Sequence, residues 1–212
     1  MSLLVAALLL SRASLAQTGP MTMPTYNPPA RLPTTDMTLR FMYFPDSKSP
    51  AYRKGAGSYQ LPDGSWHSCS KLIFDGNQLT PKDSTAHKQR FTSETIQQLV
   101  VKQDTFLVVK DLPGRKVAPP KPDFLHSCVN RQGIRLLALY YESGRATYFL
   151  IRPHVSMQLL PTGRAEFKTA MLAIVKDSPA LSAKIASGKL GRDEVVKIVE
   201  EYADFRRTNP LH

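Results

Sequence analysis

Two His-Ser-Cys triplets, at residues 67–69 and 126–128, contain both cysteines of the chain and are its most chemically suggestive pattern. Alternate residues of a β-strand share a face, so each triplet would present a nitrogen and a sulfur in the same direction. If the two strands are neighbours, these groups form a Cys₂His₂ set suited to zinc, although His-x-Cys is not a usual ligand spacing. The candidate ligands are His67, Cys69, His126 and Cys128.

A disulfide between Cys69 and Cys128 is the alternative, because an even number of cysteines in an exported chain favours pairing when the Cα atoms are close. Two separately buried thiols are the third option. A Cys–His nucleophile would also need an oxyanion donor and a group that orients the histidine, and the local sequence supplies no signature for either. We therefore predict no catalytic residue and no bound cofactor, with zinc as the one metal that the pattern admits.

The stretch that must organise the core is residues 134–152. Two apolar runs, Ile134–Tyr141 and Ala146–Ile151, flank the four-residue connection Glu142-Ser143-Gly144-Arg145. Their β-branched and aromatic content and the glycine in the connection predict a β-hairpin. Both alternating faces of the first run are apolar, so we expect this hairpin to be covered on both sides.

Short strand-like runs extend from Ser58 to Leu160 and are separated by Pro-Asp-Gly and Asp-Gly turns. This spacing predicts a mostly antiparallel sheet, curved like a roll or half-barrel, within a β-rich domain at residues 52–163. Simple alternation places Trp66 on one face with Leu72 and Phe74, which predicts a core position for the tryptophan.

From Ala165 the apolar period becomes helical. Ser178-Pro179 supplies an N-cap and a first-turn proline, and Gly191 with Glu194 begins a last helix that has an apolar stripe. A short amphipathic helix is marginal in water by itself, so we expect residues 164–207 to pack on the sheet. The predicted fold class is therefore α+β, a mostly antiparallel sheet with a C-terminal helical segment.

The N-terminal residues predict export. Leu3–Leu10 is an apolar run too short to span a bilayer, and Ser14-Leu15-Ala16 has the small-x-small pattern of signal peptidase sites, although no basic residue precedes the run. We expect a signal peptide at residues 1–16 and a mature chain that begins at Gln17, is periplasmic or secreted, and has no transmembrane segment. Prolines predict an extended, mobile segment at residues 17–51.

The net charge of +11 raises the prospect of an anionic partner, but the basic residues are scattered along the chain. Nucleic acid is not favoured. We expect a non-enzymatic envelope or secreted protein, a binding or structural component with an unknown envelope or extracellular partner. A polyanion-binding protein that recognises a glycan or a lipid headgroup is the first alternative. A metal-dependent enzyme that uses the two triplets is the second.

Several segments resemble a group of uncharacterised exported bacterial proteins. They are KLIFDGN, RFTSETIQQLVV, the hairpin end YFLI, and a tail with FKTAMLAIVKDSPALSAKI and DEVVKIVEEY. The similarity covers about Ser58 to Arg206. The resemblance implies a β-rich region followed by short C-terminal helices, together with export, and it implies no activity and no site residue.

Overall fold

In the part of the chain that the structure describes, ten antiparallel strands form one open sheet, and a helical segment follows the sheet along the chain. The computed structural model describes residues 49–82, 89–114, 121–141 and 143–209, all within the compact unit Phe44–His212. The order across the sheet is β10-β9-β8-β7-β6-β5-β1-β2-β3-β4, so β10 and β4 are its edges. The predicted α+β class, with a mostly antiparallel sheet and C-terminal helices, is confirmed.

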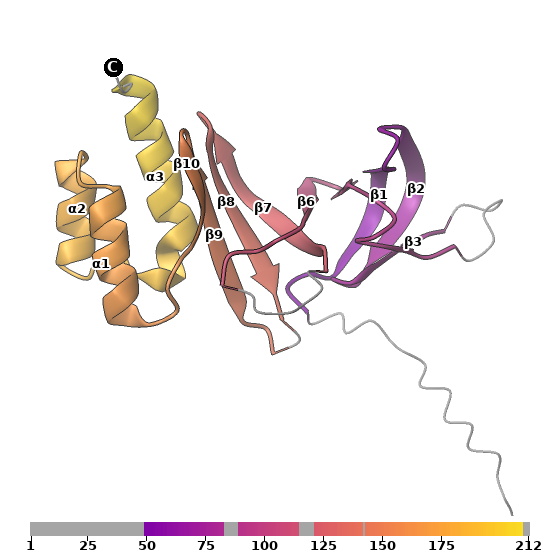
Figure 1. Cartoon of the computed structure of the whole chain (residues 1–212), viewed down its shortest axis with the longest axis horizontal. Coiled ribbons are helices and arrows are strands. Elements are labelled where there is room, and N and C mark those ends of the chain that lie inside the picture. Colours follow the sequence, from indigo (N-terminus) through magenta and orange to yellow (C-terminus); the bar gives the residue numbers. More distant parts are fainter. Residues whose placement is uncertain (1–48, 83–88, 115–120, 142, 210–212) are drawn as a thin grey trace, which may run out of the picture. The chain divides into compact units, whose positions relative to one another are not determined.

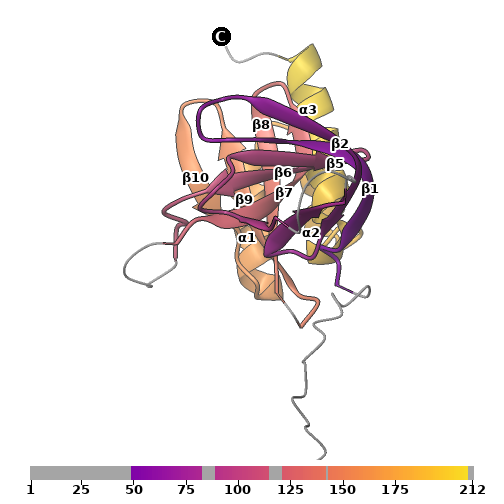
Figure 2. The ribbon, with the colours of Figure 1, turned by 90° about the vertical axis from the view of Figure 1, so that its right-hand side faces the viewer.

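The strands are β1 Arg53–Gln60, β2 Trp66–Phe74, β3 Gln78–Pro81, β4 Phe91–Thr92, β5 Gln98–Val101, β6 Asp104–Val109, β7 Asp123–Arg131, β8 Ile134–Tyr140, β9 Ala146–Arg152 and β10 Val155–Leu159. The helical elements are α1 Arg164–Ile174, α2 Pro179–Ala186, the 3₁₀ turn η1 Arg192–Glu194 and α3 Val195–Thr208. In Figure 1 the helices lie against the β7–β10 part of the sheet, whereas β1–β3 form its other end. Figure 2 shows the same ribbon turned by 90°.

The sheet curls strongly between β2 and β7. The rings of Phe74 on β2 and Phe124 on β7 are 5.1 Å apart between centroids, although three strands lie between them in the sheet order. Four flat strand spacings would separate them by about 19 Å. Gly57 on β1 is closely surrounded in this region, because a Cβ there would lie 2.1 Å from the Val100 carbonyl oxygen and 2.8 Å from a Leu72 methyl group.

The helical segment is packed on the β7–β9 region through one apolar cluster, which we call the helix-side cluster. Its sheet members are Val129, Ile134, Leu136 and Leu150, and its helical members include Phe167, Met171, Leu181, Ile185, Val195, Ile198 and Tyr202. The predicted contact between Gly191 and Glu194 is present, because the Gly191 N–H donates to Glu194 Oε2 at 2.8 Å, but it begins the 3₁₀ turn η1, and α3 itself begins at Val195. Leu190 and Val195 are also buried in this cluster, in keeping with a hydrophobic contact across the helix start.

The predicted hairpin is formed by β8 and β9, and β8 is covered on both faces. Leu136 is 0% exposed and belongs to the helix-side cluster, whereas Leu137 is 1% exposed and packs on the opposite face. That second face carries a smaller cluster with Leu125 and Phe149. A strand buried on both sides explains why its sequence is apolar without alternation.

The expected core position of Trp66 is wrong, because its side chain is 48% exposed. Gly55 pairs with Leu72 but Gly57 pairs with Cys69, so β2 contains one extra residue between these positions. Such a β-bulge reverses the alternation on its two sides. Trp66 therefore does not share a face with Leu72 and Phe74.

Two predictions fall outside the described residues. The signal peptide at residues 1–16 lies wholly outside them, and so does most of the proline-rich segment at residues 17–51. In the part of the chain that the structure describes, no helix is both long enough and apolar enough to cross a membrane.

Candidate functional site

The two His-Ser-Cys triplets lie on β2 and β7, and β1, β5 and β6 separate these strands in the sheet. The two strands are therefore not neighbours in the sheet, which was the condition for a shared Cys₂His₂ set. Cys69 and Cys128 are not joined by a disulfide in the structure. Within the described residues, no three His, Cys, Asp or Glu side chains are grouped so that they could hold a metal ion.

The physical reason is that the two thiols pack into different cores. Cys69 contacts the apolar cluster inside the curl of β1–β7, whereas Cys128 contacts the helix-side cluster. His67 lies on the exposed part of β2 and stacks on Tyr59, with ring centroids 5.4 Å apart. Spacing in the sequence could not reveal this, because the order of strands in the sheet differs from their order in the chain.

His126 is instead the centre of a polar network that the sequence did not predict. Its Nε2 lies 3.1 Å from Asp104 Oδ1 on β6. Arg53 at the start of β1 donates through Nε to the other carboxylate oxygen, Oδ2. The Arg53 guanidinium also lies over the ring of Phe106, 5.7 Å from its centroid. Asp104 therefore holds a cation on one side and an imidazole on the other.

The second nitrogen of His126 faces a hydroxyl and a thiol. Nδ1 lies 3.2 Å from the Tyr140 hydroxyl on β8 and 3.5 Å from Cys128 Sγ. Because a carboxylate only accepts hydrogen bonds, Asp104 favours the tautomer with the proton on Nε2, so Nδ1 is the acceptor for Tyr140 or Cys128. We call these five residues, Arg53, Asp104, His126, Cys128 and Tyr140, the histidine network.

Sheet register places the histidine network between two apolar cores. Phe106, His126, Ala138 and Tyr148 are successive cross-strand partners, so their side chains share one face. Phe106 belongs to the cluster inside the curl, and Tyr148 packs against the helix-side cluster. A bulge at Cys128, where Ser127 pairs with Leu137 but Val129 with Leu136, turns the thiol toward the helix side.

Burial controls the protonation of this network. Desolvation opposes ionisation of Asp104, but the hydrogen bond and charge of Arg53 outweigh it, and His126 adds to them, so the pKa of Asp104 is lowered. Desolvation lowers the pKa of His126 in spite of the Asp104 charge. Desolvation, reinforced by the Asp104 charge, raises the pKa of Cys128 to about 11. Desolvation also raises the pKa of Tyr140.

The order Asp104–His126–Cys128 is that of an acid, a base and a thiol, which is the arrangement of nucleophilic triads. A catalytic cysteine, however, needs a lowered pKa and access to substrate. With its pKa near 11, the Cys128 thiol is neutral at ordinary pH. The network is therefore suited to joining the two cores through satisfied hydrogen bonds rather than to nucleophilic attack.

Acidification is expected to destabilise the protein through His126. Because its folded pKa lies below the ordinary value of 6.5, the unfolded chain binds more protons just below pH 6.5. The contribution of His126 to stability is therefore fully present above about pH 6.5 and is lost as the pH falls below that value. The melting temperature should decrease between about pH 7.5 and about pH 5, and His126→Gln should flatten that decrease.

The control for this prediction is His67→Gln, which changes a histidine on an exposed strand and should leave the slope intact. Asp104, with its lowered pKa, contributes stability that is present above its ordinary pKa of 3.8 and is lost at lower pH, so it acts in a separate window. An equal slope in wild type and His126→Gln would contradict the assignment.

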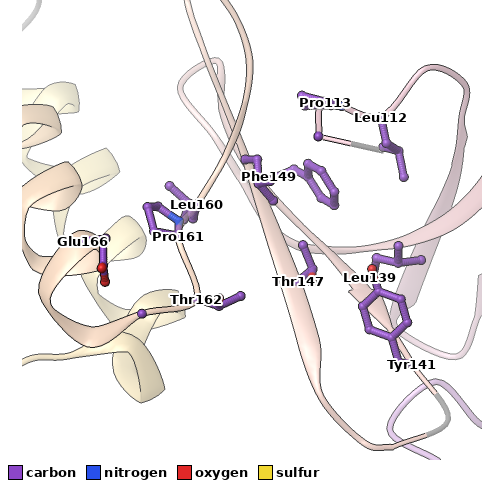
Figure 3. Close-up of a pocket in the computed structure, with 13 residues that line it drawn as sticks. Leu112, Pro113, Leu139, Tyr141, Thr147, Phe149, Leu160, Pro161, Thr162 and Glu166 are labelled. Carbon is purple, nitrogen blue, oxygen red and sulfur yellow. The ribbon is translucent and has the colours of Figure 1, made fainter. Parts of the chain in front are cut away.

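A mainly apolar cavity lies near the helix junction, on the sheet face opposite the helix-side cluster. It has a volume of about 610 Å³ and is bounded by the hairpin, the loop after β6 and the link from β10 to α1 (Figure 3). Its lining is Leu112, Pro113, Gly114, Leu139, Tyr141, Thr147, Phe149, Leu159, Leu160, Pro161, Thr162, Gly163 and Glu166. We call this cavity the apolar pocket.

The apolar pocket is open to solvent through large apolar side chains. Tyr141 and Leu159 are 48% and 41% exposed, and both line it. Glu166, in the first turn of α1, is the single charged residue of the described lining. Exposed apolar walls around a hollow of this size are typical of ligand sites.

Sequence reasoning missed both features because each depends on residues that are distant along the chain. Asp104 and Arg53 belong to no recognisable motif, and Tyr140 lies within the apolar run of the hairpin, which does not indicate a polar role. One weak signal was available: a histidine at position 126 interrupts the apolar run that begins at Phe124. A buried polar group needs a partner, so that histidine predicts a companion side chain without identifying it.

Comparison with protein-family models, with curated proteins and with solved structures finds no match for this chain. Two features of this structure bear on function: the histidine network connects the two cores, and the apolar pocket is a hollow with exposed apolar walls.

Proposed function

We propose that this protein is an exported, non-enzymatic binding protein that holds a small molecule with an apolar body in the apolar pocket. The supporting observation is the pocket itself, about 610 Å³ with a mainly apolar lining. That volume lies within the range of small-molecule sites, about 300–1,000 Å³. Glu166 at the wall favours a neutral or cationic ligand over an anionic one.

A binding role fits the histidine network better than catalysis does. Burial keeps Cys128 protonated at ordinary pH, with a pKa of about 11. None of the five residues of the network lines the apolar pocket. A ligand in that pocket therefore has no acid, base or nucleophile from the network beside it, and the pocket supplies burial and shape rather than chemistry.

Export is part of the proposal and rests on the sequence. The apolar run Leu3–Leu10 and the small-x-small pattern that ends at Ala16 support it. Mass spectrometry of the protein recovered from outside the cytoplasm of its host should then find a mature chain beginning at Gln17. Recovery of the chain with Met1 retained would contradict this part.

Binding can be tested with N-phenyl-1-naphthylamine, a neutral apolar probe whose fluorescence rises when it leaves water. The wild-type protein should give a saturable signal with one site per chain. Leu159→Asp places a carboxylate on a short side chain in the pocket wall, and burying a charge beside an apolar ligand is costly. We expect it to weaken probe binding about tenfold or more.

The matched control is Val155→Asp, the same replacement at the other large apolar residue that β10 exposes. Val155 does not line the apolar pocket, so this variant should bind the probe as the wild type does. Equal losses in the two variants, or no loss in Leu159→Asp, would contradict the assignment of the ligand to this pocket.

A further inference from the structure

A second cavity, of about 350 Å³, lies where the β7–β8 turn, the β9–β10 turn and the C-terminal part of α3 meet. Two arginines line it, Arg152 from the end of β9 and Arg206 from α3. We call it the arginine pocket. It shares no lining residue with the apolar pocket, and no aspartate or glutamate is among its described lining residues.

Arg152 has an unused hydrogen-bond donor. Its guanidinium donates through one terminal nitrogen to the neutral Gln158 side chain at 3.0 Å. Its Nε is buried and makes no hydrogen bond among the described residues. The side-chain partner of this guanidinium is a neutral amide, so its positive charge is not balanced by an acid among the described residues, and a bound anion would balance it.

Arg206 is held rigidly on the other side of the same cavity. Its Nε donates to the Tyr202 hydroxyl at 3.1 Å, and its guanidinium forms an ion pair of 2.7 Å with Asp177. Asp177 also accepts a hydrogen bond from the Tyr202 hydroxyl at 3.2 Å. These contacts balance the charge of Arg206 and fix its orientation, so the uncompensated charge in the pocket is that of Arg152.

The remaining walls are mostly apolar and come from both turns and from α3. Besides the two arginines, the lining consists of Ile134, Pro153, Val155 and Tyr202, with Gln132 and His154 as its polar members. A volume of about 350 Å³ is at the lower end of the range for small-molecule sites, about 300–1,000 Å³. The cavity thus combines one cationic end with an apolar body.

From this juxtaposition we propose that the arginine pocket binds a small carboxylate with an apolar body, its carboxylate on Arg152 and its apolar part against Ile134 and Val155. A planar guanidinium pairs with a carboxylate through two parallel hydrogen bonds, and the Arg152 guanidinium lines the cavity with the neutral Gln158 as its side-chain hydrogen-bond partner and no acidic partner among the described residues. This ligand is an anion, whereas the apolar pocket favours a neutral or cationic one, and the two pockets share no described lining residue.

The test uses the full protein, 2-naphthoate as the carboxylate and 2-naphthamide as its neutral isostere. The reporter is the Arg152 Nε–H resonance in ¹H–¹⁵N spectra, assigned by its loss in Arg152→Lys. Naphthoate should shift it saturably, with a Kd at or below about 1 mM, and naphthamide and inorganic phosphate should bind at least about tenfold more weakly.

Three results would overturn the proposal. Absence of a saturable shift with naphthoate would show that there is no site. An equal response to naphthamide would show that the charge of the ligand is not recognised. An equal response to phosphate would show that an apolar body is not needed.

Variants give a second, independent measurement, read through the Ile134 methyl resonances. Arg152→Gln should weaken naphthoate binding about tenfold, and Arg152→Lys should lose less because it retains the charge without the planar donor pair. Arg135→Gln is the matched control, since Arg135 is exposed on neighbouring β8 and does not line the cavity. An equal loss in that control would attribute binding to net charge and overturn the proposal.

Leu159→Asp separates this proposal from the function proposed above. It alters the apolar pocket, so the naphthoate titration of Arg152 should be unchanged in that variant, whereas binding of the neutral probe is weakened. Loss of the naphthoate response in Leu159→Asp would place the carboxylate in the apolar pocket and overturn the assignment to Arg152.

Discussion

A chain that ends at Gly163 is expected to lose cooperative folding. Removing α1, α2 and α3 uncovers four apolar side chains of the sheet, Val129, Ile134, Leu136 and Leu150, all of them in the helix-side cluster. Each large apolar side chain gains about 1.5–3 kcal/mol from burial, so the loss amounts to about 6–12 kcal/mol. That is comparable to the whole stability of a typical domain, about 5–15 kcal/mol.

Thermal unfolding followed by circular dichroism is the measurement for this truncation. A chain that ends at Asn209 retains all of α3 and is the control, and it should melt as the full chain does. A cooperative transition at an unchanged temperature in the shorter chain would mean that the sheet is stable without the helices. The contacts in the helix-side cluster would then contribute little to folding.

Leu136→Ala is expected to cost about 2–5 kcal/mol of the free energy of unfolding, the largest effect that we predict for a single substitution. Leu136 is 0% exposed and stands in the centre of β8, between the sheet and the helices. Its removal leaves a cavity that rigid neighbours on two layers fill only in part. Equilibrium denaturation with guanidinium chloride measures the loss directly.

Leu159→Ala is the matched control, because it makes the same replacement at an exposed leucine of the edge strand β10. Its cost should stay within about 0.5 kcal/mol. If the two replacements destabilise the protein equally, β8 is not the centre of the core, and the double coverage of the hairpin does not carry its stability.

Local patterns were enough to predict most of the secondary structure. The apolar runs around Gly144 predicted the hairpin, and the change to helical spacing after Ala165 predicted the C-terminal segment. The turn and cap residues act within a few positions of themselves, as Gly191 does with Glu194. Interactions of this kind join residues that are close together in the sequence, so their pattern can be recognised there, and the α+β class could be predicted for that reason.

The alternation of side chains along a strand predicted the wrong face where a β-bulge interrupts the strand. Both triplets lie on strands that contain one extra residue, between Cys69 and Leu72 on β2 and at Cys128 on β7. A bulge carries no sequence signature as strong as a turn, yet it changes the face of every residue beyond it. The misplaced Trp66 is the direct consequence.

By itself, then, the amino-acid sequence determined the strands, the hairpin, the helices and the double coverage of β8, because each follows from the period of neighbouring residues. Only the tertiary structure decided which side chains meet. The order of strands in the sheet separates Cys69 from Cys128 and places Asp104 next to His126. The packing of α3 places Arg206 in the same cavity lining as Arg152. These contacts between distant residues depend on strand order and on the curl of the sheet, and neither can be predicted from a local sequence pattern.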